Sequence, residues 1–255
     1  MTMSSRRLII GNWKMNPATL EDAKRIARRT RAVAARLENT EAVVCPPFPF
    51  MAAAISRKPA ANFHIGAQSV SIEDGGAHTG EVSAAMLKSL GVEFIIAGHS
   101  EARTAGETDS IVSKKIARIL EAGMIAVVCV GEKSRDENGG HFEFLKNQIK
   151  GSFAGIAEDK VRHIIISYEP VWAIGGKEAM VPSDINEMAI FVKKTFADLF
   201  GAEAGLKLKV LYGGAVNFRN AGEIIKTGRV DGLLVGRESV NMPGFVELLK
   251  AVDKI

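Results

Sequence analysis

The chain has 255 residues, of which 47% are hydrophobic and 24% are charged, and its formal net charge is +4. These values are ordinary for a globular protein with a sizeable core, and they exclude a disordered chain. Its two cysteines, Cys45 and Cys129, belong to no C-x-x-C or other metal-ligand pattern, so nothing supports a zinc site or a disulfide framework. We expect both thiols to be buried as small hydrophobic groups in a reducing compartment.

The beginning of the chain predicts a cytoplasmic protein with no membrane partner. Residues 1–7 are polar and basic, and the apolar run at 8–10 is too short for a signal peptide or a membrane span. Basic residues gather at 24–36 without the interleaved aromatic residues that favour nucleic-acid binding. We interpret this stretch as a solvated helix face, while the mild positive charge suits an anionic substrate.

Short apolar runs alternate with stretches of helical periodicity along the chain. The runs that predict strands lie at 8–10, 43–45, 63–65, 94–97, 125–130, 164–167, 209–212 and 233–235. The helical stretches include 20–37, 110–121, 184–199 and 245–252. This alternation predicts right-handed βαβ units and a parallel sheet. Eight units in a chain of this length favour the α/β class and a closed (β/α)8 barrel, a single domain over residues 1–255.

Two helix boundaries have local signals. Ser183 follows Pro182 and is expected to cap the helix at 184–199. Gly123 is expected to end the helix that precedes the fifth strand, because a glycine tolerates the left-handed conformation common at that position.

In a barrel of this kind, the active site lies at the C-terminal ends of the strands. The segments just past the predicted strands supply a lysine, a histidine, several glutamates and two glycine-rich loops. They are 11–14, 45–47, 66–68, 98–101, 130–132, 168–170, 212–214 and 235–237. One face of the barrel is therefore expected to hold both acid-base and anion-binding groups.

Glu169 and His99 are the candidate acid-base residues. Glu169 ends the sixth strand before an apolar segment containing Trp172, and a carboxylate that loses its hydration there becomes a stronger base. The tryptophan in a glycine-flanked loop is typical of a lid that excludes water from a ligand. His99 precedes Ser100, which is expected to begin a helix whose field disfavours the imidazolium ion. No pair of histidines has metal-ligand spacing, so we predict no metal site.

Anion binding is expected at the glycine-rich loops that end the seventh and eighth strands. Glycines such as Gly214 and Gly236 let backbone N–H groups approach a phosphate, and these two loops are the usual phosphate site of a barrel. Lys14, which leaves the first strand together with Asn12, is a candidate for binding the same anion or charge that develops during reaction.

Six motifs in this order resemble those of the triosephosphate isomerase family over the whole chain. They are Asn-Trp-Lys-Met-Asn at 12–16, Gly-Ala-His-Thr-Gly-Glu at 76–81, Gly-His-Ser-Glu at 98–101, Cys-Val-Gly-Glu at 129–132, Tyr-Glu-Pro-Val-Trp-Ala-Ile-Gly at 168–175 and Leu-Tyr-Gly-Gly at 211–214. The resemblance implies a TIM barrel that interconverts dihydroxyacetone phosphate and glyceraldehyde 3-phosphate through an enediol(ate), in glycolysis and gluconeogenesis, without a cofactor.

The resemblance also assigns roles to individual residues. Glu169 would move a proton between two carbon atoms while neutral His99 polarises the carbonyl, a pairing already established for this family. Lys14 and Asn12 would stabilise the developing oxyanion, and Glu101 would support them. The residues implied in phosphate binding are Gly175, Ala215, Gly236, Arg237 and Gly214.

The same resemblance implies a lid and a partner subunit. The lid would run from about Pro170 to Met180 and would include Pro170, Val171, Trp172, Ala173, Ile174, Gly176 and Lys177. The family is usually a homodimer, so the loop with Thr79 would reach the partner's site, and Glu81 would lie at the interface.

The chain departs from the family pattern at three places. Ala215 stands where a serine usually bonds the closed lid, and Gly176-Lys177 replaces the usual Thr-Gly, so the closed lid is expected to be held differently or less firmly. Ala102-Arg103 replaces two arginines, and the stretch to Gly106 is one residue short. Whether Arg103 takes over the usual pairing with the partner's residue at the position of Glu81 is left open by the sequence.

Two other functions remain open at this point. The altered lid also fits an isomerase of a longer sugar phosphate, such as a tetrulose phosphate. A non-catalytic barrel used for binding is the third reading, although that reading predicts the loss of an acid-base residue and Glu169, His99 and Lys14 are all present.

Overall fold

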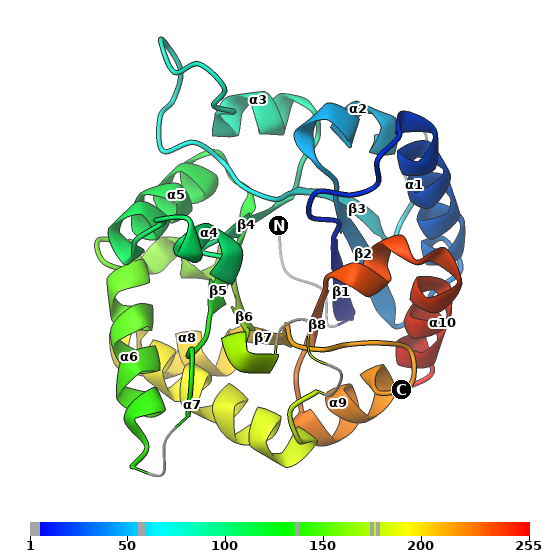
Figure 1. Ribbon diagram of the computed structural model, residues 1–255. Helices are drawn as coiled ribbons and strands as arrows, with labels where there is room; N and C mark the ends of the chain where they lie inside the picture. Colours follow the sequence, from blue (N-terminus) through cyan, green and yellow to red (C-terminus); the bar gives the residue numbers. More distant parts are fainter. Residues whose placement is uncertain (1–5, 56–59, 136–137, 174–175, 177–178) are drawn as a thin grey trace.

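Eight parallel strands close into a barrel in the computed structural model, which describes residues 6–55, 60–135, 138–173, 176 and 179–255 (Figure 1). Each strand pairs with its neighbours in sequence, and β8 pairs with β1. The strands are β1 (Arg7–Asn12), β2 (Thr40–Cys45), β3 (Phe63–Ala67), β4 (Phe94–Ala97), β5 (Ile125–Val130), β6 (Ile164–Tyr168), β7 (Lys209–Tyr212) and β8 (Gly232–Val235). Every predicted strand run lies within one of these strands, so the barrel prediction is confirmed.

Helices surround the barrel, and Figure 1 shows them as an outer ring. They are α1 (Leu20–Ala34), α2 (Met51–Ala54), α3 (Ala84–Ser89), α4 (Ser100–Thr104), α5 (Asp109–Glu121), α6 (Gly140–Ser152), α7 (Pro182–Phe200), α8 (Ala202–Lys207), α9 (Ala221–Gly228) and α10 (Met242–Asp253). The short 3-10 helices are η1 (Phe48–Phe50), η2 (Glu158–His163), η3 (Val171–Ala173) and η4 (Arg237–Val240). Among the described helices, none has both the length and the hydropathy needed to cross a membrane.

Strand residues alternate between two hydrophobic cores. Ile10, Val43 and Ile96 belong to the cluster of side chains inside the barrel, whereas Ile9 and Val44 belong to the larger cluster between strands and helices. This alternation follows from the two-residue period of a strand. Because both faces are covered, the middle of each strand is mainly apolar, and most polar strand residues, such as Arg7, Asn12 and Thr40, lie at a strand end.

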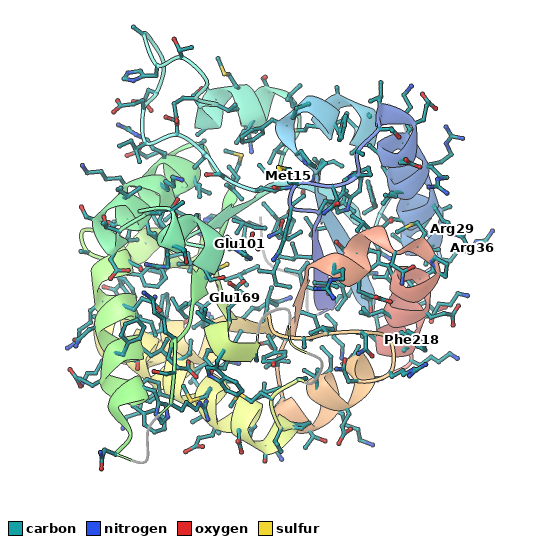
Figure 2. All side chains as sticks on the ribbon, in the orientation of Figure 1. Met15, Arg29, Arg36, Glu101, Glu169 and Phe218 are labelled. Carbon is teal, nitrogen blue, oxygen red and sulfur yellow. The ribbon has the colours of Figure 1, made fainter. Side chains whose placement is uncertain are left out.

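The helix α1 shows why the basic stretch stays at the surface. Ala23, Ile26 and Ala27 pack inward at helical spacing, and the Thr19 hydroxyl caps the first turn by accepting from the Asp22 N–H at 3.2 Å. Arg25, Arg28 and Arg29 are exposed, and Figure 2 shows Arg29 pointing away from the barrel. Arg31 is the exception, because its guanidinium donates to the Ala54 carbonyl and lies over the Phe63 ring. The prediction of a solvated basic face is therefore confirmed except at Arg31.

One of the two helix boundaries was predicted wrongly. The helix α7 begins at Pro182 with Val181 as its N-cap residue, so Ser183 lies inside the first turn, where its hydroxyl donates to Asp184 instead of capping the helix. Proline suits the first helical position because it has no N–H to leave unpaired there. The other boundary is confirmed: α5 ends at Glu121, and Gly123 takes a left-handed φ of +68°.

Both cysteines are buried and form no disulfide, as the sequence predicted. Burial raises the pKa of the Cys45 thiol, which lies inside the barrel. Burial and then the charge of Glu169 raise the pKa of Cys129. Both thiols are therefore neutral packing groups.

Candidate active site

A cavity of about 630 Å³ opens at the C-terminal ends of the strands. Its lining includes nine of the residues singled out from the sequence: Asn12, Lys14, His99, Glu101, Glu169, Gly214, Ala215, Gly236 and Arg237. Gly176, from the expected lid, also lines it. Figure 2 shows Glu101 and Glu169 over the middle of the barrel. The strand ends therefore bring together the acid-base and anion-binding groups that the sequence predicts at this face.

Glu169 follows β6 directly and is only 2% exposed. Among the described residues, neither of its carboxylate oxygens has a hydrogen-bond partner. The backbone around it leaves no room for larger neighbours, because a Cβ at Gly213 would lie 2.6 Å from the Glu169 Cγ and one at Gly131 would lie 1.8 Å from its carbonyl oxygen. A buried carboxylate with no donor of its own is well prepared to accept a proton from a ligand in the cavity.

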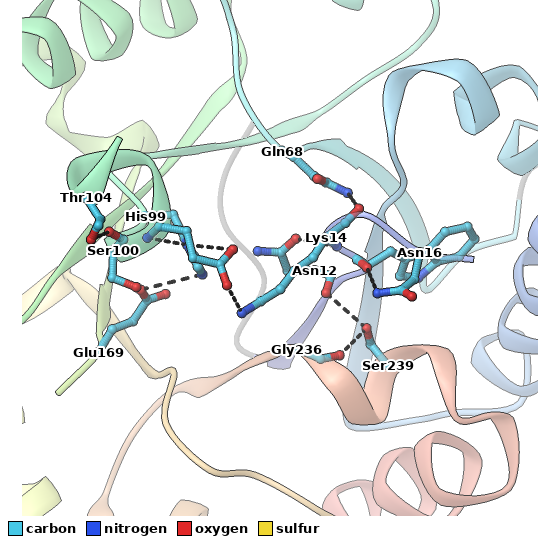
Figure 3. Close-up of polar contacts among 12 residues, drawn as sticks. Asn12, Lys14, Asn16, Gln68, His99, Ser100, Thr104, Glu169, Gly236 and Ser239 are labelled. Atoms are coloured by element: carbon cyan, nitrogen blue, oxygen red, sulfur yellow. Dashed lines mark hydrogen bonds and ion pairs between the residues drawn. The ribbon is translucent and has the colours of Figure 1, made fainter. Parts of the chain in front are cut away.

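His99 faces Glu169 across the site, with Nε2 at 3.9 Å from the Glu169 Oε2 (Figure 3). Its ring caps α4, because Nδ1 accepts the Glu101 backbone N–H at 3.2 Å. The prediction that a helix begins at Ser100 is confirmed. Since Nδ1 is the acceptor, the hydrogen of a neutral ring lies on Nε2 and is available to a ligand in the cavity.

Lys14 reaches the same cavity from the end of β1. Its ammonium group donates to the Glu101 Oε1 at 2.6 Å, which supports the predicted link between these two residues (Figure 3). Lys14 has a left-handed φ of +54°, an uncommon conformation for a lysine. Its backbone N–H donates to the Asn12 Oδ1 at 3.1 Å, and its carbonyl accepts from Gln68 at 2.9 Å.

Gln68 is a site residue to which sequence reasoning gave no role. Its Nε2 bonds the carbonyls of Lys14 and Cys45 at 2.9 and 2.8 Å, and so joins β1, β2 and the loop after β3. Its position just past a strand indicated that it lies near the site. The sequence alone does not indicate which distant carbonyls it bonds.

The glycine-rich loops after β7 and β8 also line the cavity. Asn220 donates to the Ala215 carbonyl at 2.9 Å and shapes the first loop. Ser239 donates to the Gly236 carbonyl at 2.7 Å and shapes the second (Figure 3). A Cβ at Gly236 would lie 3.8 Å from the Lys14 Nζ, so the ammonium group lies next to this loop. Sequence reasoning missed both supporting residues, since an asparagine and a serine in loops are common.

The expected lid is described only in part. Ile174, Gly175 and Lys177 lie outside the described residues. Val171, Trp172 and Ala173 form η3, directly after Pro170.

A buried glutamate anchors the start of this segment. Glu132 is 1% exposed and accepts hydrogen bonds from Tyr168 at 2.8 Å, Arg135 at 2.9 Å and Trp172 at 3.1 Å. Burial and the charge of Glu132 raise the pKa of the Tyr168 hydroxyl, which therefore stays a donor. Glu132 is a structural anchor at the barrel mouth, because its acceptor oxygens are already occupied.

Thr79 and Glu81 do not line the cavity. Both are exposed on the loop between β3 and α3, which extends away from the barrel in Figure 1. Arg103, whose direction the sequence left open, turns inward and bonds the Gly98 carbonyl and Asp109 of its own chain. The guanidinium of Arg103 is therefore engaged by groups of its own chain.

The comparisons with known proteins agree on one family. A model of the triosephosphate isomerase family matches residues 7–252. The chain belongs to the triosephosphate isomerase family. It is 36% identical over 246 residues to the triosephosphate isomerase of Moorella thermoacetica, a match that covers 96% of this chain and 98% of that one. The crystal structure of triosephosphate isomerase from Bartonella henselae matches with a TM-score of 0.84 and 34% identity over 96% of this chain and 98% of that one.

Within this triosephosphate isomerase fold, a different contact joins β7 to the segment around Met180. Ala215 has no hydroxyl to offer, but the Tyr212 hydroxyl accepts the Met180 backbone N–H at 3.1 Å. This bond joins the end of β7 to the residue just before Val181 and α7. Tyr212 lies shortly before Ala215 in the chain, the position at which the family usually has a serine.

Proposed function

We propose that this chain interconverts dihydroxyacetone phosphate and D-glyceraldehyde 3-phosphate by proton transfer through an enediol(ate). The observation that carries the proposal is the Glu169 carboxylate, which has no hydrogen-bond partner among the described residues and faces the His99 Nε2 at 3.9 Å in a cavity that Lys14 also lines. The family membership of the chain supports the same reaction. No bound cofactor is needed, because the step moves only protons and electron pairs already present in the substrate.

Glu169 acts first. Its carboxylate removes a proton from C1 of dihydroxyacetone phosphate, the C–H electron pair forms the C1–C2 double bond, and negative charge passes to the oxygen on C2. His99 stabilises that oxygen through its Nε2–H. A proton then moves from the oxygen on C1 to the oxygen on C2 through the imidazole. Glu169 returns its proton to C2, and C1 is left as the aldehyde.

Lys14 and Asn12 supply the favourable field for this charge. The ammonium group of Lys14 is already oriented by Glu101, so little reorganisation is needed when the oxyanion forms. The phosphate is placed on the loops after β7 and β8, at Gly214, Ala215, Gly236 and Arg237, with Gly175 as a further donor. The lid, from about Pro170 to Met180, covers the bound substrate and excludes water, which protects the enediolate from losing phosphate.

The dimer and the location are also proposed. Met15, next to Lys14, is 94% exposed, and the loop that carries Thr79 and Glu81 extends from the barrel. We infer that a second copy covers this region, with Thr79 near Asn12 of its partner, and that the enzyme works in the cytoplasm. Covering Met15 would remove a large apolar side chain from water, which would stabilise such an interface.

The test is a steady-state assay with purified protein and glyceraldehyde 3-phosphate, coupled to reduction of the dihydroxyacetone phosphate that forms. A four-carbon tetrulose phosphate is assayed in parallel. We expect kcat/KM to be at least about 10-fold higher for the three-carbon substrate, because one extra carbon unit in a fitted pocket typically changes kcat/KM by roughly 10-fold or more. A higher kcat/KM for the four-carbon substrate would assign the protein to the alternative reaction.

A further inference from the structure

Gly98, the residue before His99, is held from both sides by charged side chains. Its N–H donates to the Glu107 Oε1 at 2.7 Å, and its carbonyl accepts from the Arg103 Nε at 2.7 Å. The first bond orients the peptide group that enters Gly98, and the second orients the peptide group shared by Gly98 and His99. The backbone that carries the imidazole is therefore fixed by two charge-assisted hydrogen bonds.

Arg103 connects this turn to three other elements. Besides Gly98, its guanidinium donates to Asp109 at 2.5 Å, to the Ser152 hydroxyl at 3.0 Å and to the Cys129 carbonyl at 3.4 Å. These partners lie at the start of α5, the end of α6 and within β5. An arginine with its planar fork occupied in this way has little freedom, so the end of β4 is tied rigidly to its surroundings.

Glu107 is itself held in place. Its side chain is 9% exposed, and its second carboxylate oxygen pairs with Lys115 at 2.6 Å. Lys115 also donates to the Ser69 hydroxyl at 2.8 Å. Because the carboxylate is fixed and nearly buried, its bond to the Gly98 N–H is a strong positional restraint.

The turn accepts only glycine. Gly98 has a left-handed φ of +72°, and a Cβ there would lie 2.9 Å from the Arg103 Nη2 and 3.1 Å from Val112. The absence of a side chain at Gly98 therefore lets its backbone lie close to the Arg103 guanidinium. The lining of the cavity includes neither Arg103 nor Glu107, and the turn that both of them bond is the one that carries His99 into it.

We propose that Arg103 and Glu107 are positioning residues that together set the place of the His99 imidazole over the substrate carbonyl. The proposal rests on the role given to His99 under the proposed function. It also accounts for the inward direction of Arg103, whose guanidinium donates to groups of its own chain. An error of about 1 Å in the place of a catalytic group can lower a rate by about 100-fold.

The first test replaces Arg103 in the full-length enzyme. We expect Arg103→Met to lower kcat by about 10- to 100-fold with KM changed less than about threefold, since substrate binding is untouched while the electrophile is misplaced. Arg103→Lys, which keeps one donor for the Gly98 carbonyl, should recover part of the loss. The matched control is Arg31→Met, because Arg31 also donates to a backbone carbonyl, that of Ala54, but lies on α1 away from the cavity. We expect this control to keep the wild-type kcat.

The second test addresses Glu107 and does not depend on the first variant folding. Glu107→Leu removes the acceptor for the Gly98 N–H, whereas Glu107→Gln keeps an oxygen there. We expect kcat to fall in the leucine variant and to remain near the wild-type value in the glutamine variant. Equal losses in both variants, or unchanged kcat in both, would overturn the role of Glu107.

A double variant and an NMR signal separate this inference from the proposed function. If Arg103 acts through His99, Arg103→Met should cost less than about threefold in kcat when added to His99→Gln. Nitrogen-15 NMR of the histidine ring should show a shifted His99 signal in Arg103→Met and an unshifted one in Arg31→Met. A full additional loss in the double variant, or an unshifted signal, contradicts the positioning role. Wild-type kcat in His99→Gln alone contradicts instead the proposed catalytic role of His99, while the NMR signal still reports whether Arg103 holds the ring.

Discussion

In the proposed mechanism, Glu169 and His99 have different roles that follow from their surroundings. The Glu169 carboxylate is buried without a donor in the described part of the chain, and the His99 ring is fixed by the Glu101 N–H that it accepts. One group is thus prepared to take a proton, while the other presents a hydrogen to the cavity. Their difference comes from the hydrogen bonds around each side chain and needs no bound ion.

Glu169→Gln tests the first of these residues. The amide has nearly the shape of the carboxylate but cannot accept the proton from carbon, so we expect kcat to fall by about 100-fold or more. The coupled assay measures the loss, and circular dichroism with a thermal melt checks that the barrel is intact. Near-wild-type turnover would rule out Glu169 as the proton carrier.

His64 gives a residue-scale prediction about stability. Its Nδ1 lies 2.9 Å from the Glu93 Oε1, and its ring makes an edge contact with Phe94. Burial by itself lowers the pKa of His64. The hydrogen bond and charge of Glu93 and the charge of Glu41 raise it by a larger amount, so the net pKa lies above the ordinary value of 6.5. Protonated His64 therefore stabilises the folded state most at low pH.

We expect the wild type to be more stable than His64→Gln below about pH 6.5, and we expect this advantage to shrink as the pH rises through the folded-state pKa. Urea denaturation midpoints of both proteins between about pH 5.5 and about pH 9 measure the difference. A constant difference across this range would mean that the charge of His64 does not contribute.

At the scale of elements, the C-terminal ends of the strands determine which side chains meet. The loop after β7 passes against Glu169 so closely that Gly213 has no space for a side chain. Gly213→Ala should push the Glu169 side chain out of place and lower kcat by about 100-fold, because a Cβ would lie 2.6 Å from its Cγ. Steady-state kinetics of the variant measure this effect.

Gly222→Ala is the matched control. Gly222 lies within α9, and a Cβ there would meet only Ile255, at an ordinary 3.4 Å. We expect unchanged kinetics and a gain in stability of about 0.5–1 kcal/mol, since alanine restricts the unfolded chain more than glycine does. A loss of activity in this variant would show that the effect at Gly213 is not specific to the site.

The altered lid sequence leads to a prediction about Ala215. Because Gly176-Lys177 also replaces the usual Thr-Gly of the lid, Ala215→Ser supplies a hydroxyl without its usual partner. We expect kcat to change by less than about threefold, below the several-fold effect of a complete neutral hydrogen bond. A large increase in kcat, measured in the same coupled assay, would contradict this expectation.

At the scale of the whole molecule, the exposed Met15 and the loop with Thr79 lead to a prediction about assembly. Met15→Glu places a charge at a surface that we propose a second copy covers, so the protein should become monomeric and kcat should fall by about 10-fold or more. Sedimentation velocity measures the oligomer, and the coupled assay measures the activity.

Leu206→Glu is the control for this substitution. Leu206 is 83% exposed on α8, and the same change there adds a charge to a surface outside the proposed interface. We expect the wild-type oligomer and activity. A monomeric wild type, or a Met15→Glu variant that remains dimeric, would contradict the proposed interface.

Local patterns in the sequence determined the strands, the closed barrel and the residues at its mouth. The strands are buried on both faces, so their apolar runs predicted them without knowledge of the fold. Glu169, His99 and Lys14 were predicted as site residues because the C-terminal ends of the strands meet at one face of a barrel. The wrong prediction of Ser183 as a helix cap also has a cause in the neighbouring sequence, because Pro182 occupies the first helical position and leaves Ser183 inside the helix.

Only the tertiary structure decided how these residues are supported. Lys14 and Glu101 are 87 positions apart, and Arg103 reaches Ser152 across 49. The bonds of Gln68 and the bonds of Glu132 to Tyr168 and Trp172 depend on such distant partners. Arg103 combines near partners, Gly98 and Asp109, with the distant Cys129 and Ser152. A sequence pattern records which face a side chain occupies, but hydrogen-bond partners are set by the packing of elements that are remote in the chain.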